Sequence, residues 1–359
     1  MNKHFAPAGA PLRQLGVGIV EVMVSIAVGL FILAGVVQLY ASSTQNSMVV
    51  SASSTIQENA RYIFSRLGQD VSQSGYAGCF SFSGSGNRYK NIVAGSVAAG
   101  QLHDFAQFID GENDKSLNGR TFDSVTLRYA SAQERQVIQS VSGTTITVAD
   151  SSGFEQEQIA VAGDCSRLVV FKIANIPGAT GAISFAQSGG GVTYNTTSDI
   201  EVELYGADDV NNLPLGASLS YIYGGTSGAV QYHVDTSAAG IAAGQTCGTT
   251  NPQYCALYRK STVASKGDEL IEGVENFEVE YGWQSHNDGT LYYANAASVG
   301  ANWGLIDRVK ISATLNSVSR APTNDGSTYI SRTYARTFMI QNQVPGDKQV
   351  RTEPAVVSI

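Results

Sequence analysis

The first hydrophobic segment of this chain is apolar on every side. Residues 17–40 read VGIVEVMVSIAVGLFILAGVVQLY and carry a single charged side chain, that of Glu21. As a helix, this segment would be about 36 Å long at ~1.5 Å per residue, enough to cross a hydrocarbon core of ~30 Å. The pattern predicts a membrane-spanning helix. Its lone carboxylate is a functional candidate because a charge in lipid is costly.

The apolar pattern then becomes that of an amphipathic helix. Over residues 41–78 apolar side chains recur at helical spacing, and no proline interrupts the chain from residue 17 to residue 75. We expect one continuous helix of about 55 residues whose second half packs on a globular head. Gly29 and Gly35 are expected bending points, Gly68 a weak point, and Gly75 with Gly78 the end. The apolar face comprises Ile56, Ala60, Ile63, Phe64, Leu67 and Val71.

Beyond Cys79 the pattern changes to short alternating segments separated by turns, which predicts a β-rich head. Residues 80–120 and 235–252 are expected to form loops and residues 266–273 a turn or short helix, while residues 174–198 stay unassigned. The expected strands are residues 122–130, 135–141, 144–149, 158–162, 167–173, 200–205, 219–223, 230–234, 254–260, 275–283, 306–315 and 333–340.

The residues before the apolar segment read as a removable leader. Residues 1–16, MNKHFAPAGAPLRQLG, hold two basic side chains and no acidic one, so this end is expected to stay in the cytoplasm. An ordinary signal peptide is cleaved after its apolar run, where no clear small-residue site occurs here. A cut between Gly16 and Val17 would instead leave the apolar helix on the mature protein.

This start resembles the class III leader of type IV pilins and type II secretion pseudopilins. Gly16 matches the glycine before the scissile bond, Val17 the new N-terminus, and Glu21 the glutamate five residues into the mature chain. The resemblance implies cleavage by the prepilin peptidase and N-methylation of Val17. The chain departs from the commonest pattern at Val17, where phenylalanine is usual, and at Gly18, where a hydroxyl residue is usual. A buried Glu21 needs a cation, which the free amine of a neighbour's residue 17 can provide.

Charge and composition limit the partners. The formal net charge is −8, and removing the leader leaves 20 basic and 30 acidic residues, or −10. An acidic surface argues against a broad nucleic-acid interface. Hydrophobic residues make up 43% of the chain, which is enough to exclude a disordered protein.

Four cysteines beyond the membrane segment predict disulfides formed in an oxidising periplasm. A metal site is disfavoured because no C-x-x-C pair occurs and the histidines are scattered. Three connectivities are possible, and we favour Cys79–Cys165 with Cys247–Cys255. The second pair closes a short polar loop, and the first would tie the end of the long helix to a strand.

Several later segments resemble PilW-type minor pilins. QENARYIFSRLGQDVSQSGYAGC at 57–79 is similar to their amphipathic helix end, and GDCSR at 163–167 to their second cysteine motif. DELIEGVENFEVEYG at 268–282 and DRVKISATLNSVSR at 307–320 resemble their C-terminal strands. Residues 174–260 resemble no known segment. The resemblance implies an α+β fold, in which a long N-terminal helix packs on a β-rich, pilin-like globular head.

The expected organisation has four parts: a leader at 1–16, a transmembrane helix half at 17–40, an amphipathic helix half at 41–78 and a head at 79–359. The resemblance implies a minor pilin, with no enzymatic activity and no cofactor, that helps initiate type IV pilus assembly in a tip or priming complex. Its implied partners are the prepilin peptidase, other minor pilins, the major pilin, the inner-membrane assembly machinery and a PilY-type tip protein. The chain would start in the inner membrane with a periplasmic head and end near the tip of a surface fibre.

Two alternatives stay open. A minor pseudopilin of type II secretion would carry the same leader, so the leader cannot separate the two. A signal-anchored periplasmic enzyme or adhesin would retain Met1.

Motifs for other chemistry are weak. No G-x-S-x-G, H-E-x-x-H or Walker sequence occurs. Residues 110–114 alternate oxygen ligands as a calcium loop does, but Lys115 stands where an EF-hand loop needs glycine, so a solvated turn is expected. The remaining expectations are a plain hairpin loop at 286–289, a solvated strand face carrying Glu278 and Glu280 beside Glu275, and core or rim packing for Trp283, Tyr292, Tyr293 and Trp303.

Overall fold

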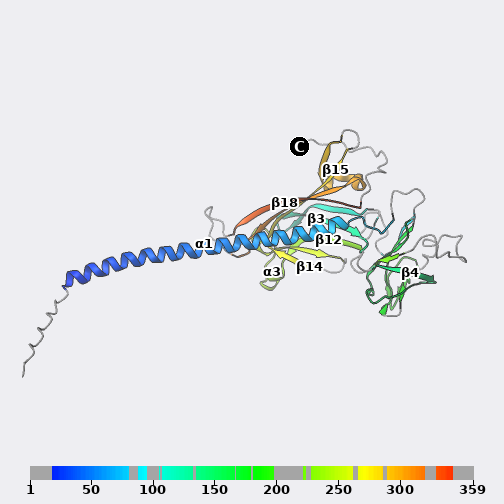
Figure 1. Cartoon of the computed structure of the whole chain (residues 1–359), viewed down its shortest axis with the longest axis horizontal. Helices are drawn as coiled ribbons and strands as arrows, with labels where there is room; N and C mark the ends of the chain where they lie inside the picture. The colour runs from blue at the N-terminus through cyan, green and yellow to red at the C-terminus, as the bar shows by residue number, and fades with distance from the viewer. Residues whose placement is uncertain are drawn as a thin grey trace, which may run out of the picture.

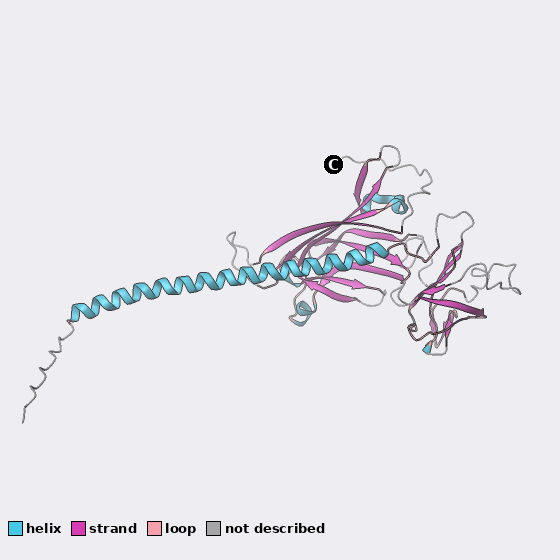
Figure 2. Cartoon of the chain, in the orientation of Figure 1, coloured by secondary structure: helices cyan, strands magenta, loops and turns pink. Residues whose placement is uncertain are grey.

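A long helix projects from a β-rich head in the computed structural model of the chain (Figure 1). The sheets of the head form two bodies, one packed along the helix and one beyond its end (Figure 2). The fold is therefore the predicted α+β arrangement. The residues described are 18–80, 88–94, 105, 107–131, 135–165, 167–178, 181–197, 221–223, 228–261, 266–285, 289–319 and 329–342.

Helix α1 runs without a break from Ile19 to Gln73, 55 residues, as the sequence predicts. It passes Gly29 and Gly35 without interruption, so these glycines are not break points in the structure. It ends where Gly75 and Gly78 adopt φ of +77° and +70°, conformations that side chains with a Cβ rarely adopt. Its first half is exposed and its second half buries one face in the head.

The helix-packed body consists of two antiparallel sheets. One has the order β14-β13-β12-β3-β2 and the other β16-β15-β17-β18. In the first sheet, the short helices α3 (Ala238–Ala242) and η2 (Pro252–Tyr254) lie between β12 and β13 along the chain; in the second, α4 (Ala296–Val299) and η3 (Gly300–Leu305) lie between β16 and β17. The strands are β2 (Ile109–Leu117), β3 (Arg120–Tyr129), β12 (Gly228–Thr236), β13 (Cys255–Lys260), β14 (Asp268–Glu272), β15 (Val274–Gln284), β16 (Leu291–Asn295), β17 (Arg308–Asn316) and β18 (Ser331–Met339).

The distal lobe is a seven-stranded sheet of order β1-β7-β6-β11-β4-β5-β8 with a small β9-β10 hairpin. Only β1 and β7 run parallel within it. Its strands are β1 (Arg88–Asn91), β4 (Arg135–Ser142), β5 (Thr145–Val148), β6 (Ile159–Gly163), β7 (Arg167–Lys172), β8 (Ala182–Ser184), β9 (Ser188–Gly189), β10 (Val192–Thr193) and β11 (Tyr221–Tyr223).

Most of the distal lobe, all of it except β1, is inserted between two neighbouring strands of the helix-packed body. Strands β3 and β12 pair antiparallel, and the last residue of β3, Tyr129, lies opposite the first of β12, Gly228. Strands β4 to β11 all lie between these two positions in the sequence. For β4 to β11 the chain therefore leaves and re-enters the helix-packed body at one point, beside the C-terminal end of α1 (Figure 1). Strand β1 reaches the lobe separately, from the segment between α1 and β2.

Three hydrophobic cores hold these parts together. The largest joins the apolar face of α1 to both sheets of the helix-packed body, and includes Ile63, Leu67 and Phe277. A second lies inside the distal lobe. A third lies at the junction, where Ala77 and Phe80 after the helix pack with strands β6 and β7 of the lobe.

The predicted strands within the described residues are present with shifted ends, whereas residues 200–205 lie outside those residues. Three expectations are wrong. Strand β2 replaces a loop because its polar sequence, IDGENDKSL, pairs through its backbone with β3 and needs no apolar alternation. Strand β14 replaces a turn or short helix because it pairs with β13. Helix α3 lies inside the expected loop at 235–252, and η2 begins at the last residue of that loop.

Candidate assembly site along the long helix

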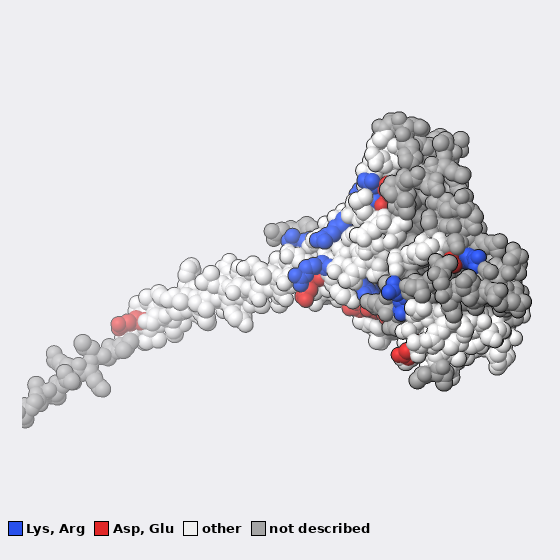
Figure 3. All heavy atoms as spheres, turned by 45° about the vertical axis from the view of Figure 1, so that its right-hand side comes forward, with Lys and Arg blue, Asp and Glu red and all other residues white. Residues whose placement is uncertain are grey.

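The exposed half of α1 is the most apolar surface of the described residues. Ile19 is 81% exposed and Phe31 86% exposed, values that a water-soluble protein avoids along a whole helix. Among the described residues, α1 is the one helix long and apolar enough to cross a membrane. Figure 3 shows this stretch bare of charge except near its free end. This half of α1 fits a membrane anchor.

Glu21 lies in the first turn of α1, which begins after the N-cap residue Gly18. The backbone N–H of Glu21 donates to the carbonyl of Gly18 (3.0 Å), and the Ser25 hydroxyl donates to the Glu21 carbonyl (2.7 Å). Both bonds use backbone atoms of Glu21, and among the described residues no ion pair holds its carboxylate. The residues of the expected cleavage, Gly16 and Val17, lie outside the described part of the chain.

The buried end of α1 is fastened to the head through a second carboxylate, which the sequence reasoning missed. Asp70 is 2% exposed. It accepts hydrogen bonds from Arg259 Nε (2.7 Å) on β13, from the Tyr129 hydroxyl (3.0 Å) on β3 and from the Tyr232 hydroxyl (2.6 Å) on β12. One acid on the helix thus binds three adjacent strands. Its signal in the sequence is an aspartate within the apolar face, between Leu67 and Val71.

The chemistry of this cluster keeps it charged and paired. Burial opposes the charge on Arg259, but hydrogen bonds and attraction to Asp70 dominate and raise the pKa of Arg259 above its ordinary value. Burial and then the negative charge of Asp70 raise the pKa of Tyr232, so its hydroxyl remains a donor. A buried ion pair with each oxygen hydrogen-bonded is a positioning device. We therefore interpret Asp70 as the residue that fixes how helix α1 packs on the head.

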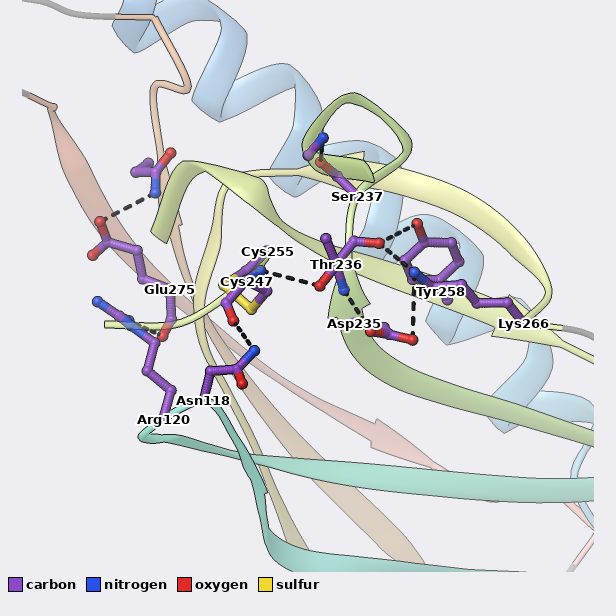
Figure 4. The surroundings of a disulfide bond; sticks show 12 residues. Asn118, Arg120, Asp235, Thr236, Ser237, Cys247, Cys255, Tyr258, Lys266 and Glu275 are labelled. Carbon is purple, nitrogen blue, oxygen red and sulfur yellow. Dashed lines mark hydrogen bonds and ion pairs between the residues drawn. A yellow bond between two sulfur atoms is a disulfide. The ribbon is translucent and has the colours of Figure 1, made fainter. Parts of the chain in front are cut away.

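Two disulfides join the same pairs that the sequence favours. Cys79–Cys165 connects the segment after α1 to the turn between β6 and β7, in place of the expected strand, and we call it the helix-end disulfide. Cys247–Cys255 closes the loop before β13, and we call it the short-loop disulfide. Figure 4 shows the second: the Cys247 N–H donates to Thr236 Oγ1 (3.0 Å), and Asn118 Nδ2 donates to the Cys247 carbonyl (2.7 Å).

The acidic run at 110–114 lies within β2 and is not a turn. Asp110 pairs with Arg128 (2.8 Å), a side chain only 1% exposed, so this carboxylate is committed to the fold. Asp114 and Glu112 are exposed. Among the described residues no group of His, Cys, Asp or Glu is placed to hold a metal ion.

The carboxylates of β15 also take structural partners. Glu280 forms an ion pair with Lys310 on β17 (2.6 Å), and the exposed Glu278 accepts from Asn276 Nδ2 (2.9 Å). Glu275 accepts from Asn316 Nδ2 (3.2 Å). These contacts give the solvated strand face that the alternation predicts.

The aromatic side chains pack as expected. Trp283 stacks on Tyr292 (6.0 Å between ring centroids), and Trp303 contacts Tyr281 edge to face (4.7 Å). Residues 286–288 lie outside the described part of the chain.

One comparison with known proteins gives a match. The profile of the family described as Type IV Pilus-assembly protein W, PilW, matches residues 231–351. The C-terminal part of this chain matches the PilW family. The matched region begins within β12, where the chain returns from the distal lobe, and contains strands β13 to β18. Searches of curated proteins and of solved structures return no match.

The PilW match confirms the resemblance over the C-terminal segments at 268–282 and 307–320. It also covers residues 231–260, where the sequence analysis found no resemblance. The similar segments at 57–79 and 163–167 lie outside the matched region and remain predictions. The description of the matched family names type IV pilus assembly. Together with the apolar helix it indicates a protein of the cell envelope or the pilus.

Proposed function

We propose that this chain is a minor pilin that helps to initiate type IV pilus assembly as part of a tip or priming complex. The observation that carries the proposal is the exposed apolar half of α1, whose one acid is Glu21, continuous with a second half that packs on a head whose C-terminal part matches PilW. In this role the prepilin peptidase removes residues 1–16, and Val17 becomes the methylated N-terminus. The helix then leaves the inner membrane and enters the fibre.

Glu21 supplies the driving contact in this proposal. In the bilayer an unpaired carboxylate is penalised, by about 2.5–3.5 kcal/mol at the centre of a membrane helix and by less in the first turn, where Glu21 lies. The free amine of residue 17 on a neighbouring subunit relieves that cost when the helices bundle. Because Glu21 needs a neighbour, this subunit is not the outermost one in the complex.

The size of the head supports a place at or near the tip. A distal lobe that extends beyond the helix end is difficult to accommodate at every step of a narrow fibre (Figure 1). Other minor pilins, the major pilin, the inner-membrane assembly machinery and a PilY-type tip protein are the partners that follow.

The mature N-terminus tests the processing step. Mass spectrometry of the protein purified from membranes should give a chain that starts at Val17 and carries one methyl group. A chain that retains Met1 would refute the proposal and favour a signal-anchored protein.

A substitution tests the assembly contact. Glu21→Ala should strongly reduce the amount of this subunit in sheared fibres, while Glu58→Ala, an exposed acid on the same helix, should not. Equal incorporation of both variants would contradict the role of Glu21. Gene deletion separates the alternatives, because loss of surface pili supports the pilus and loss of protein secretion supports a pseudopilin.

A further inference from the structure

Strand β18 is an edge without the protection that the other described edges have. Natural sheets shield their edges by keeping them short, bulged or covered. Strands β14 and β16 have five residues each, β1 four and β8 three. Strand β2 has nine, but its register shifts between Glu112 and Lys115, and α4 packs beside it. Strand β18 has nine residues and pairs with β17 without a shift.

The outer edge of β18 is accessible although α1 lies against one of its faces. Phe338 packs on that face, 6.3 Å from Phe64 between ring centroids. No described strand pairs with the edge opposite β17. The sequence SRTYARTFM has no proline and is rich in residues that favour strands. This edge therefore presents backbone donors and acceptors that an extended chain can pair with.

The side chains beside this edge are basic. Arg332 and Arg336 alternate with Tyr334 and Phe338, so all four point to one face of β18, and both arginines are exposed. Arg332 Nη2 donates to the Ser53 hydroxyl (3.2 Å), and the Arg336 guanidinium lies 5.8 Å from the Phe64 ring centroid. Neither forms an ion pair with a described carboxylate.

Helix α1 adds a third basic side chain on the same flank. Arg61 is exposed and stands two helical turns before Gly68, whose face of the helix meets Phe338. Figure 3 shows Lys and Arg side chains gathered where α1 enters the head. The basic flank, Arg61 with Arg332 and Arg336, contrasts with the acidic balance of the whole chain, −8.

We propose that β18 is the docking edge for an extended acidic segment of a neighbouring subunit. The segment adds antiparallel or parallel to β18 and places two acids on the face of Arg332 and Arg336. Self-pairing of two copies is disfavoured, because antiparallel pairing centred on Tyr334 sets Arg332 against Arg336 of the other copy, and like charges directly opposite are destabilising. That the segment comes from another pilus subunit rests on the proposed function; the docking chemistry does not.

A peptide assay tests the docking chemistry with the full chain in detergent micelles. The probe is a fluorescent, extended Thr/Val peptide of about nine residues with two glutamates at the spacing of Arg332 and Arg336. A second peptide carries lysines instead. We expect the glutamate peptide to bind at least about tenfold more tightly than the lysine peptide, and Arg332→Glu with Arg336→Glu to reverse this preference. Arg135→Glu, at an exposed arginine of the distal lobe, is the matched control and should change neither affinity.

N-methylation of the glutamate peptide tests strand addition on the unaltered protein. One version carries methyl groups on alternate amides of one peptide edge, and the other on the remaining amides. Exactly one version should lose binding, and hydrogen exchange should slow at β18 amides when the unmethylated peptide is bound.

Three results would each overturn the proposal: no binding of the glutamate peptide, equal binding of both methylated versions, or exchange protection elsewhere than β18. Any of these would leave the role in pilus assembly standing. Conversely, a chain whose N-terminus retains Met1 yet binds the glutamate peptide at β18 would refute the proposed function alone.

Discussion

Replacing Asp70 with asparagine should weaken the packing of helix α1 on the head and lower the stability of the protein. The change keeps the size of the side chain but removes its charge and introduces an amide donor among donors. Arg259 would then remain buried with no acid to pair with, and the Tyr129 and Tyr232 hydroxyls would compete for one remaining acceptor oxygen.

The cost can be estimated from the burial of the pair. The Arg259 side chain is 10% exposed and that of Asp70 3%. Removing one partner of a buried ion pair typically costs about 3–5 kcal/mol, because the other charge is left uncompensated. For a domain of this size each kcal/mol lowers Tm by roughly 2–4 °C, so we expect a fall of about 10 °C.

The assay is thermal unfolding of the full chain in detergent micelles, followed by circular dichroism at the strand signal of the head. Glu58→Gln, an exposed acid on the same helix, is the control and should shift Tm by less than about 1 °C. The double variant Asp70→Leu with Arg259→Met should be more stable than Asp70→Asn, because it removes both charges. If Asp70→Asn melts with the unaltered protein, the cluster does not fasten the helix.

Three further predictions concern a glycine of α1, the two disulfides and a histidine of the head. Gly68→Ala places a Cβ 2.8 Å from Phe338 Cε1, so the substitution should lower the free energy of unfolding or leave it unchanged. In a Phe338→Ala background the same substitution should raise the free energy of unfolding by about 1 kcal/mol, because alanine favours the helix over glycine; equal effects in both backgrounds would exclude the contact. Removing the helix-end disulfide, which spans 86 residues, should lower the free energy of unfolding by about 4–5 kcal/mol by chain entropy. Removing the short-loop disulfide, which spans 8 residues, should lower it by about 2–3 kcal/mol. Urea unfolding of the two double-alanine variants measures both losses, and the reverse order would refute the prediction. Burial and then the charge of Lys260 lower the pKa of His233 to about 4 from 6.5. Between these two pH values the unfolded chain binds a proton and the folded chain does not, so the free energy of unfolding decreases as pH falls from 6.5 to about 4, by on the order of 1–2 kcal/mol because the ring is partly exposed. His233→Gln should make the free energy of unfolding in urea less dependent on pH over this range.

The sequence predicted the helix and most strands because those elements carry a periodic apolar face. Helix α1 was predictable to within a few residues from the spacing of Ile56 to Val71 and from the glycines that follow. Strands β2 and β14 were not, since an edge strand needs only one paired neighbour and these two carry few apolar residues and no apolar alternation. The spacing of apolar residues indicates which side of an element is buried. It does not reveal strands such as β2 and β14, which are placed by backbone pairing with a neighbouring strand.

The Asp70 cluster could not be derived from local pattern because its members come from four distant elements. The sequence analysis did not single out Asp70, although it lies within an apolar helix face, and nothing adjacent in the sequence identifies Arg259 as its partner. The insertion of the distal lobe was equally hidden. Strand alternation does not reveal that β3 and β12 are neighbours, because that pairing is a property of the folded sheet.

The crossing between Tyr129 and Gly228 carries β4 to β11 out of the helix-packed body and back, which makes this part of the distal lobe replaceable as a unit. A turn of about two to five residues could join β3 directly to β12 as a continuous hairpin. Helix α1 and the contacts of Asp70 with β3, β12 and β13 would be kept. The Cys79–Cys165 disulfide and the junction core tie the inner side of the lobe to the end of α1, so sequence change carries little penalty for the rest of the fold only in the outer part of the lobe. The region that matches PilW starts just past the crossing and therefore lies in the base of the molecule.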